Sequence, residues 1–313
     1  MLIRDAIGAN MARLKGLGAW QMERDGVVIT YRRRKGPFVQ RPKPAPPGIV
    51  EGRYYELVLS NGCPHRCAYC YLQLTFKGNK EPTLYTNPWS EVQPELDAVR
   101  SGVFTTGELA DSLAIVPPLL PAAIDYFSNQ STRHLFLLTK STNISVLESF
   151  KPCDQVSIGF SVNAPHISAR YEHGAPHPYK RLEAAFRLKE LGWRVHIRID
   201  PIILEGDFFL YNPLCLKIRE LEPETISVGT LRSFKNLFKY NPRSPRRSLV
   251  PCFDGRMRYP FQMRLDAYRR IADWLGRIPY LTKETERMWK ALGWDEREAG
   301  GDHYAKLAGT KRC

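Results

Sequence analysis

No stretch of 18 or more apolar residues occurs in this chain, although a membrane-spanning helix needs about that many. The first twenty residues, MLIRDAIGANMARLKGLGAW, also lack the apolar core and the small-residue cleavage site of a signal peptide. Acidic residues are scarce, with 32 Asp and Glu against 46 Lys and Arg, so the formal net charge is +14. We therefore expect a cytoplasmic protein that does not enter the membrane. The charge favours a polyanionic partner such as nucleic acid, although charge alone leaves an anionic membrane surface open.

Paired C-x2-C knuckles, the usual pattern of zinc sites, are absent as well. Seven cysteines is an odd number, and three of them crowd into eight positions, which favours metal ligation over a disulfide framework. These three lie in Asn61-Gly-Cys63-Pro-His-Arg-Cys67-Ala-Tyr-Cys70-Tyr71, directly after a predicted strand. The spacing C-x3-C-x2-C lets three thiolates hold three corners of a [4Fe–4S] cluster and leaves the fourth iron without a protein ligand.

That fourth iron can be chelated by S-adenosylmethionine (SAM), which one-electron transfer then cleaves to a 5′-deoxyadenosyl radical. The motif therefore predicts a radical SAM enzyme with a [4Fe–4S] cluster and SAM as cofactors. A zinc site built from the three cysteines and His65 is one alternative, although His65 would have to bend back within its own loop. A plain electron-transfer cluster is another.

From about residue 53 onward, short β-rich runs alternate with longer helical patterns. We predict strands over 54–59, 102–105, 134–139, 156–161, 195–199 and 226–228. We predict helices over 109–126, 143–150, 179–191, 214–221 and 262–276. Alternation of this kind indicates βαβ units with right-handed crossovers. Six units predict an α/β fold of the partial (β/α)6 TIM-barrel type, open on one side, with its chemistry at the carboxyl ends of the strands.

The chain divides into three predicted parts. Residues 1–50 form an N-terminal extension that we expect to be irregular and docked on the surface, because it carries a basic run and a proline-rich stretch. Residues 51–277 form the barrel, with a basic rim segment over 231–260. Residues 278–313 form a C-terminal extension with one helix over 283–292 and a polar tail.

Polar and small residues at the carboxyl ends of the predicted strands can meet a cofactor bound across the barrel. Backbone carbonyls after the second strand suit the SAM amino group, and a lysine after the third can neutralise its carboxylate. A hydroxyl and an amide after the fourth strand suit carboxylate or ribose, and the segment after the fifth offers apolar edges for adenine. The predicted SAM-binding residues at these ends are Gly107, Glu108, Lys140, Ser161, Asn163 and Ile203.

Over about residues 50–230 the chain resembles the spore photoproduct lyase family of radical SAM enzymes. The resemblance rests on Ser60-Asn-Gly-Cys63 through Cys70-Tyr-Leu-Gln73, Leu138-Thr-Lys140, Phe160-Ser-Val-Asn163, Glu183-Ala-Ala and Ile199-Asp-Pro-Ile-Ile203. It implies a partial barrel, SAM as cofactor, and light-independent reversal of a thymine dimer in DNA. In that family the radical removes a hydrogen from the methylene bridge of the dimer, the bridge breaks, and a hydrogen returns to the product. The resemblance places Tyr69 beside the adenine, Tyr71 on the hydrogen-return path, and Lys140 and Ser161 at SAM.

The chain departs from the family pattern after the second strand, where lyases proper carry the cysteine that returns the hydrogen. Thr105 or Thr106 stands at that position here, and a threonine O–H bond is too strong to donate a hydrogen atom. Either another group replaces the thiol, with Cys252 and Cys313 as candidates, or the chemistry differs. The candidate catalytic residues are Tyr71, Thr105 and Cys252.

Eight Lys or Arg and a single acid, Asp254, lie between Arg232 and Arg258, interleaved with four aromatic residues and followed by a fifth, Tyr259. Cations that meet phosphates, beside aromatics that stack on bases, are typical of nucleic-acid binding. We predict nucleic-acid contacts by Arg232, Lys235, Arg243, Arg246 and Arg247. The alternative is a solvated basic loop that its aromatic residues anchor to the body.

The sequence thus favours a radical SAM enzyme acting on DNA, reduced by a partner such as flavodoxin or ferredoxin. One alternative is radical SAM modification of a nucleoside, an RNA base or another small molecule. A different class of protein, in which a structural or redox-sensing cluster serves a non-catalytic nucleic-acid-binding protein, also stays open.

Overall fold

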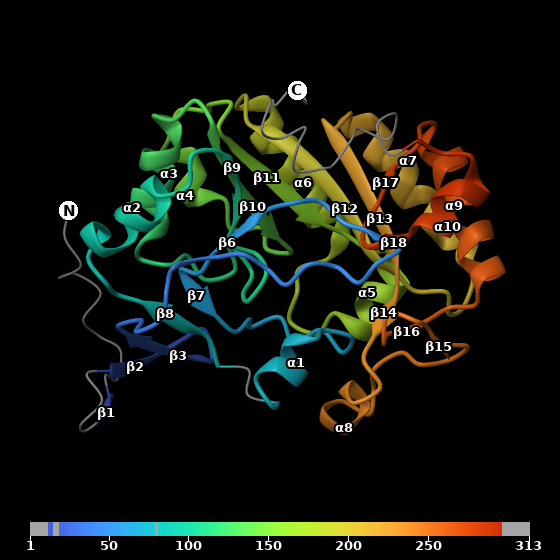
Figure 1. The fold of residues 1–313 in the computed structure, drawn as a ribbon, viewed down its shortest axis with the longest axis horizontal. Coiled ribbons are helices and arrows are strands. Elements are labelled where there is room, and N and C mark those ends of the chain that lie inside the picture. Colours follow the sequence, from blue (N-terminus) through green and yellow to red (C-terminus); the bar gives the residue numbers. More distant parts are fainter. Residues whose placement is uncertain (1–11, 15–18, 79–80, 296–313) are drawn as a thin grey trace.

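A curved, largely parallel sheet forms the centre of the molecule in this computed structural model, which describes residues 12–14, 19–78 and 81–295 (Figure 1). Its strands lie in the order β17-β13-β12-β11-β10-β9-β6-β4. They are β4 (Val39–Gln40), β6 (Tyr55–Leu57), β9 (Gly102–Thr105), β10 (Arg133–Thr139), β11 (Val156–Ser161), β12 (Arg194–Ile202), β13 (Thr225–Thr230) and β17 (Tyr280–Leu281). Neighbours from β6 to β17 pair in parallel, and β4 is antiparallel to β6.

All six predicted strands are present, each beside the one that precedes it in the sequence, so the predicted fold class is confirmed. Helices follow the strands and cover one face of the sheet (Figure 1). They are α2 (Trp89–Asp97), α3 (Leu120–Ser128), α4 (Ser145–Glu148), α6 (Pro178–Glu190), α7 (Asn212–Leu221) and α9 (Phe261–Leu275). The main hydrophobic core includes buried residues of both layers, and β4 and β17 form the two edges of this sheet in the described part of the chain.

A second, smaller apolar cluster consists of Tyr54, Val103 and Phe136, with Leu138 packed against it. Gly159 on β11 faces this cluster, and a Cβ built there would lie 2.5 Å from Cζ of Phe136. Only glycine therefore lets β11 lie this close to the Phe136 ring. On the same face, further along the strands, the side chains become polar, with Ser161 and Arg198 in register on β11 and β12.

The N-terminal region differs from its prediction. Strands β2 (Ala19–Arg24) and β3 (Val27–Arg32) form a hairpin, and together with β1 (Ala12–Leu14), β8 (Thr83–Tyr85) and β7 (Ser60–Asn61) they make a five-stranded sheet. The expectation that residues 1–50 are irregular is therefore wrong for 19–32. Asp25 and Gly26 both have positive φ, as the two central residues of a type I′ hairpin turn require, and this Asp-Gly pair was a readable hairpin signal.

Two predicted helices begin later than expected. The helix predicted over 109–126 begins at Leu120, because the preceding segment is hydrogen-bonded to β10, for example through Ser112 N–H and the Leu138 carbonyl at 3.1 Å. The helix predicted over 283–292 is α10 (Glu286–Leu292), which Thr285 caps by accepting from Met288 N–H at 3.2 Å. Residues 296–313, including Cys313 and most of the predicted tail, lie outside the described residues.

No helix in the described part of the chain is long and apolar enough to cross a membrane.

Short elements complete the described fold. They are β5 (Ile49–Val50), α1 (Leu72–Thr75), α5 (Pro165–Tyr171), the 3-10 helix η2 (Phe208–Tyr211), β14 (Arg232–Ser233), α8 (Leu237–Tyr240), β15 (Val250–Pro251), β16 (Met257–Arg258) and β18 (Glu284–Thr285). Strands β14, β16 and β15 form a small antiparallel sheet within the basic segment 231–260. The basic segment therefore has regular structure of its own.

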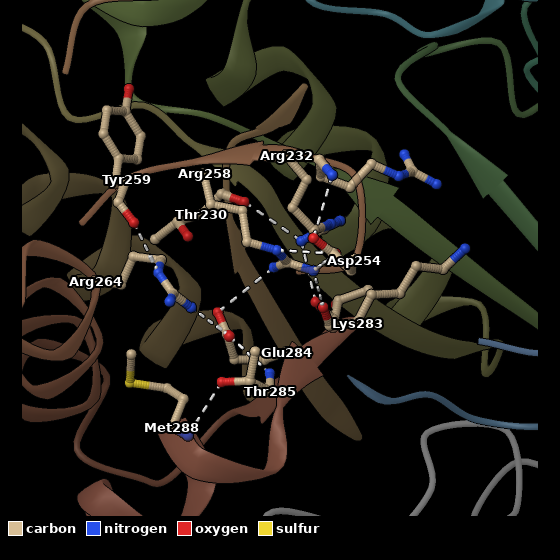
Figure 2. Close-up of polar contacts among 12 residues, drawn as sticks. Thr230, Arg232, Asp254, Arg258, Tyr259, Arg264, Lys283, Glu284, Thr285 and Met288 are labelled. Atoms are coloured by element: carbon tan, nitrogen blue, oxygen red, sulfur yellow. Dashed lines mark hydrogen bonds and ion pairs between the residues drawn. The ribbon is translucent and has the colours of Figure 1, made fainter. Parts of the chain in front are cut away.

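Buried charges fasten this small sheet to the C-terminal part of the fold. Figure 2 shows Arg258 next to Asp254 and Glu284, and Arg264 between Glu284 and the main chain of Tyr259. Arg258 Nη2 lies 2.5 Å from Asp254 Oδ2, and Arg264 donates to Glu284 and, at 3.0 Å, to the Tyr259 carbonyl. Arg258 and Glu284 are 2% and 0% exposed. Arg258 therefore holds the small sheet in place and does not contribute to an exposed basic surface.

Replacing Gly159 by Ala tests the close approach of β11 to Phe136. The added methyl group overpacks the site, and we expect a loss of about 1–3 kcal/mol in the free energy of unfolding, measured by urea denaturation. Phe136→Leu in the same chain removes the clash, so the double variant is expected to be less destabilised than the sum of the two single changes. Gly36→Ala is the control, because its methyl group would meet only the Arg34 side chain, at 3.7 Å. If the double variant loses as much free energy of unfolding as the two single variants together, the expected clash between residue 159 and Phe136 does not occur.

Replacing Glu284 by Gln tests the buried charge network. Burial opposes ionisation, but the charges of Arg264 and Arg258 outweigh it and hold the pKa of Glu284 below its ordinary value. A carboxylate with a lowered pKa stabilises the fold above its unfolded-state pKa of about 4.3, and this contribution is lost as the pH falls further. We expect Glu284→Gln to cost about 3–5 kcal/mol at pH 7, and the difference from wild type to shrink below about pH 4.3.

The measurement is urea unfolding across this pH range. Glu220→Gln is the matched control, because Glu220 forms an exposed ion pair with Lys217 at 2.6 Å and should contribute less than about 1 kcal/mol. A pH-independent difference between wild type and Glu284→Gln would show that the carboxylate charge is not what stabilises the network.

Candidate functional site

The three cysteines lie on one loop between β7 and α1. Cys63, Cys67 and Cys70 are free thiols, and the pKa of Cys63 is raised by burial and further by the nearby Asp111, Cys67 and Cys70. Burial also raises the pKa of the Cys67 and Cys70 thiols, so their deprotonation requires a compensating positive charge such as that of bound iron. Three close thiols on one loop fit the ligand set of a cluster with one open iron.

The zinc alternative gains no support from the structure. Among the described residues, no three His, Cys, Asp or Glu are grouped so that they hold a single metal ion. His65, the fourth ligand that a zinc site would need, is buried, and its Nδ1 lies 3.0 Å from the Gly174 carbonyl.

Contacts with the segment between α5 and α6 hold the cysteine loop in place. Besides the His65 contact, Ala68 N–H donates to the Tyr171 carbonyl at 2.7 Å, and Tyr69 donates its hydroxyl hydrogen to Glu172. From the other end of the loop, Gln73 Nε2 donates to the Cys67 carbonyl at 2.6 Å. The loop is therefore fixed through both side chains and main chain before any cofactor binds.

Lys140 and Ser161, predicted from two different strand ends, are adjacent to each other and to this loop. Lys140 Nζ donates to Ser161 Oγ at 2.7 Å and lies 5.8 Å from the centroid of the Tyr69 ring. The Lys140 charge lowers the pKa of Cys67 and Cys70, against the larger effect of burial. An ammonium group, a hydroxyl and an aromatic face thus gather next to the cysteine loop.

Beneath this group lies a buried ion pair that the sequence did not reveal. Arg181 on α6 meets Glu172 at 2.6 Å, with both side chains 0% exposed, and also donates to the Ser161 carbonyl at 3.0 Å. Burial opposes the ionisation of Glu172, but Lys140 and Arg181 lower its pKa below the ordinary value. Glu172 thus stays charged and orients Tyr69.

Asn163 and Ile203 lie near each other but are turned into the protein. Asn163 Nδ2 donates to the Pro201 carbonyl at 2.8 Å, and its Oδ1 accepts from the Tyr211 hydroxyl at 2.7 Å. Ile203 is 1% exposed, and its N–H donates to the same Tyr211 hydroxyl at 2.9 Å. The Asn163 amide therefore joins the ends of β11 and β12, and the structure gives no support to its predicted direct contact with SAM.

Thr105, the last residue of β9, and Thr106 stand where the family resemblance implies a hydrogen-donating cysteine. Thr105 Oγ1 accepts from Gly107 N–H at 3.2 Å, and Thr106 Oγ1 donates to Ser112 Oγ at 2.7 Å. Both threonines are buried, so their hydroxyls shape this segment. Tyr71 donates its hydroxyl hydrogen to the Glu108 carbonyl, which places Tyr71 and the predicted Gly107-Glu108 element together.

Arg232 lies elsewhere than predicted. Its Nη2 is 2.7 Å from Asp200 Oδ2, and its Nη1 donates to the Thr282 carbonyl at 3.0 Å, so it does not belong to the exposed basic surface. Arg198 on β12 approaches the same carboxylate at 2.8 Å. Although burial opposes it, the charges of Arg232 and Arg198 lower the pKa of Asp200. The Asp200-Pro201 pair indicated the end of this strand in the sequence. The sequence did not reveal that Arg198 and Arg232 pair with Asp200.

A pocket opens next to this cluster, between β12, β13, β17 and the segments before β6 and after β9. Its lining residues are Glu51, Gly52, Glu108, Arg198, Ser227, Tyr280, Thr282 and Lys283. It contains charges of both signs, and Glu108 connects it to Tyr71.

The rest of the basic segment lies beside the cysteine loop. Helix α8 packs against α1, as Figure 1 shows, and Asn241 Nδ2 donates to Gln73 Oε1 at 3.1 Å. The other four predicted nucleic-acid contacts, Lys235, Arg243, Arg246 and Arg247, are exposed. Aromatic residues accompany the cations, since the Arg256 guanidinium lies 3.8 Å from the Phe234 ring centroid and Phe253 is 66% exposed.

Comparisons with known proteins agree with this arrangement. The family model for spore photoproduct lyase matches residues 50–227. The spore photoproduct lyase of Clostridium acetobutylicum is 27% identical over 204 residues, which cover 58% of each chain. That of a Geobacillus species is 25% identical over 256 residues, 76% of this chain and 71% of the relative. The match to the Clostridium relative thus spans little more than half of that protein's length.

Solved structures resemble the fold. A spore photoproduct lyase variant aligns with a TM-score of 0.68 at 17% identity, covering 81% of both chains. The enzyme complexed with dinucleoside spore photoproduct gives 0.66 at 19% identity, and a variant with bound AdoMet and the same dinucleoside gives 0.66 at 18%, each again covering 81% of both chains. At such low identity, these structures establish the fold alone. Because the family model spans more than half of the chain, the chain belongs to the spore photoproduct lyase family, which makes it a radical SAM enzyme with a [4Fe–4S] cluster and SAM as cofactors.

Proposed function

We propose that this enzyme acts on DNA and reverses a thymine-dimer lesion of the spore photoproduct type. The observation that carries the proposal is the placement of three elements on one rim. The free thiols of the cysteine loop lie beside the Lys140–Ser161 pair, and the basic segment 231–260 contacts the same loop through Asn241 and Gln73. A cofactor site and a polyanion-binding surface therefore adjoin.

The residues around the cysteine loop suit SAM. The Lys140 ammonium is placed to neutralise its carboxylate, and the Tyr69 ring, which Glu172 holds in position, offers a flat face to its adenine. Cys63, Cys67 and Cys70 would hold the cluster. When bound, the cluster and SAM supply the one-electron chemistry that produces a hydrogen-abstracting radical.

The exposed part of the basic segment suits DNA. Lys235, Arg243, Arg246 and Arg247 are free to meet phosphates, and the exposed Phe253 offers a ring on which an unstacked base can lie. A poorly stacked lesion costs less to extrude from the duplex than a normal base pair. Solved relatives hold dinucleoside spore photoproduct, which supports a lesion of this class.

The Cys252 thiol is our candidate for the missing hydrogen donor. Cys252 N–H donates to the Arg256 carbonyl at 2.8 Å across a hairpin turn. Burial lowers the pKa of Arg256, and Tyr71 lies near enough to oppose this shift. This hairpin therefore brings a thiol toward the tyrosine that the family resemblance places on the hydrogen-return path.

Two rival functions are separated from this one by specific observations. The hydrogen-bonded hydroxyls of Thr105 and Thr106 favour a reaction other than dimer reversal, such as radical modification of a nucleoside, an RNA base or another small molecule. A non-catalytic cluster protein that binds nucleic acid would not cleave SAM.

The six described cysteines are free, which supports a reducing, cytoplasmic setting with flavodoxin or ferredoxin as reductant.

The decisive assay incubates the anaerobically reconstituted, reduced enzyme with SAM and an oligonucleotide that carries spore photoproduct. We expect repaired thymines together with 5′-deoxyadenosine. In Cys252→Ala, SAM cleavage should continue while the yield of repaired thymine per SAM cleaved falls, because the product radical lacks its donor. Cys153→Ala, at another partly buried thiol, is the control and should behave as wild type.

Deoxyadenosine without repaired thymine in the wild-type enzyme would reject the lesion and favour another substrate. No deoxyadenosine at all would reject the enzyme. Wild-type yields from Cys252→Ala would reject Cys252 as donor while leaving dimer reversal in place.

A second prediction concerns the basic surface. Replacing Arg243, Arg246 and Arg247 together by Ala should weaken duplex DNA binding and make it less dependent on salt. The slope of log K against log salt should become shallower by about 0.9 for each phosphate that the variant no longer neutralises. The matched control replaces Lys180, Arg187 and Lys217, exposed cations on α6 and α7, and should leave the slope unchanged. Equal effects of the two triple variants in a fluorescence anisotropy titration would mean that the net charge, and not this surface, attracts DNA.

A further inference from the structure

Asp111, in the segment between β9 and α3, accepts hydrogen bonds from the carboxyl end of β10. Its Oδ1 accepts from Thr139 Oγ1 at 2.6 Å, and its Oδ2 accepts from Lys140 N–H at 2.6 Å. Oδ1 also accepts from the N–H groups of Leu113 and Ala114, at 3.0 and 2.8 Å. The side chain is only 7% exposed. One buried carboxylate therefore fixes both its own segment and the main chain at Lys140.

The same carboxylate also faces the cysteine loop. His65 Nε2 lies 3.4 Å from Asp111 Oδ2, and the ring is held from its other side by the Gly174 carbonyl, 3.0 Å from Nδ1. The two groups meet as a buried packing contact, because no hydrogen bond joins His65 Nε2 to the carboxylate. His65 lies in the three-residue span between Cys63 and Cys67, so the Asp111 carboxylate stands between this span and the main chain of Lys140.

The segment that carries Asp111 is itself attached to β10. Ser112 N–H donates to the Leu138 carbonyl at 3.1 Å, and Leu138 N–H donates back to Ser112 Oγ at 3.0 Å. A Cβ at Gly107 would lie 2.8 Å from the Leu138 Cβ, so this glycine permits the close approach. Asp111 thus stands on a part of the barrel that cannot shift without breaking these contacts.

We propose that Asp111 is a positioning residue, which sets the separation between the cysteine loop and Lys140 and so the fit of SAM between them. The inference rests on the proposed use of these two elements to bind SAM. A small ligand held from two sides loses affinity when the two sides move by a fraction of an ångström. Outer partners of ligating groups typically change binding or activity 10–100-fold when they are removed.

The test compares Asp111→Asn and Asp111→Ala with wild type after anaerobic reconstitution. Asp111→Asn can keep its oxygen toward Thr139, Leu113 and Ala114, but its NH2 group then faces the Lys140 N–H, which loses its acceptor. We expect the iron content to stay at the wild-type value, and the Kd for SAM, from equilibrium dialysis without DNA, to rise about 10-fold or more. The change that SAM causes in the EPR spectrum of the reduced cluster should be weakened or lost. Asp207→Asn is the matched control, because Asp207 accepts from Phe209 N–H at 2.9 Å in another loop.

Two results would overturn the inference. The first is wild-type SAM affinity and a wild-type SAM-dependent spectrum in both Asp111 variants. The second is a loss of iron in proportion to the loss of SAM binding, which would mean that Asp111 merely supports the fold. Wild-type enzyme that binds a cluster but no SAM would instead reject the proposed function, and the inference with it. Failure to repair DNA with normal SAM binding would reject the substrate alone.

Discussion

Arg181 and Glu172 are joined at 2.6 Å in an ion pair that is wholly removed from solvent. Each partner has further contacts: Arg181 donates to the carbonyls of Ser161 and Pro176, and Glu172 accepts from Tyr69 and Ser168. A buried charge without its partner typically costs several kcal/mol, so the end of β11, helix α5 and the cysteine loop depend on one another through this pair. The geometry of the candidate cofactor site follows from it, because Lys140 rests on Ser161 and beside Tyr69.

The cysteine loop is thus held on three sides by different parts of the barrel. The end of α5 and the residue after it bind the loop through Tyr171 and Glu172, and the segment after β9 faces it through Asp111. The third side is the basic segment, where Asn241 reaches Gln73, whose amide in turn holds the Cys67 carbonyl. Asn241 of the basic segment is therefore linked through Gln73 to the main chain of Cys67. Under the proposed function, the basic surface and the cofactor site adjoin.

The sequence predicted those features that depend on local pattern. The strands expected over 102–105 and 156–161 coincide with β9 and β11, because the pattern of an alternating βα unit is complete within a few residues. Lys140 and Ser161 meet for a related reason, since parallel strands bring their carboxyl ends together.

The errors arose where contacts between distant residues decide the outcome. The segment before α3 has a helical pattern, yet Asp111 and Ser112 bind it to β10 instead. Asn163 follows a strand as expected, but its amide is buried and accepts from Tyr211, 48 positions later. Arg232 resembles the other cations of its segment in the sequence, but in the fold it pairs with Asp200. Pairings of this kind cannot be read from periodicity, because they depend on which loops the barrel brings together.

The segment that begins at the end of β9 departs from the pattern that the family resemblance implies. The family keeps a reactive cysteine there, and a group that donates hydrogen to a substrate must stay accessible and unbonded. Here the Thr106 hydroxyl donates to Ser112 Oγ at 2.7 Å, and Thr105 Oγ1 accepts from Gly107 N–H. These hydrogen bonds make the segment rigid where the family pattern has a hydrogen-atom donor. That rigidity is what allows Asp111 to act as a fixed point for His65 and Lys140. If hydrogen return occurs, it must come from a different element, and the proposed donor is Cys252, whose N–H donates to the carbonyl of Arg256 within the basic segment.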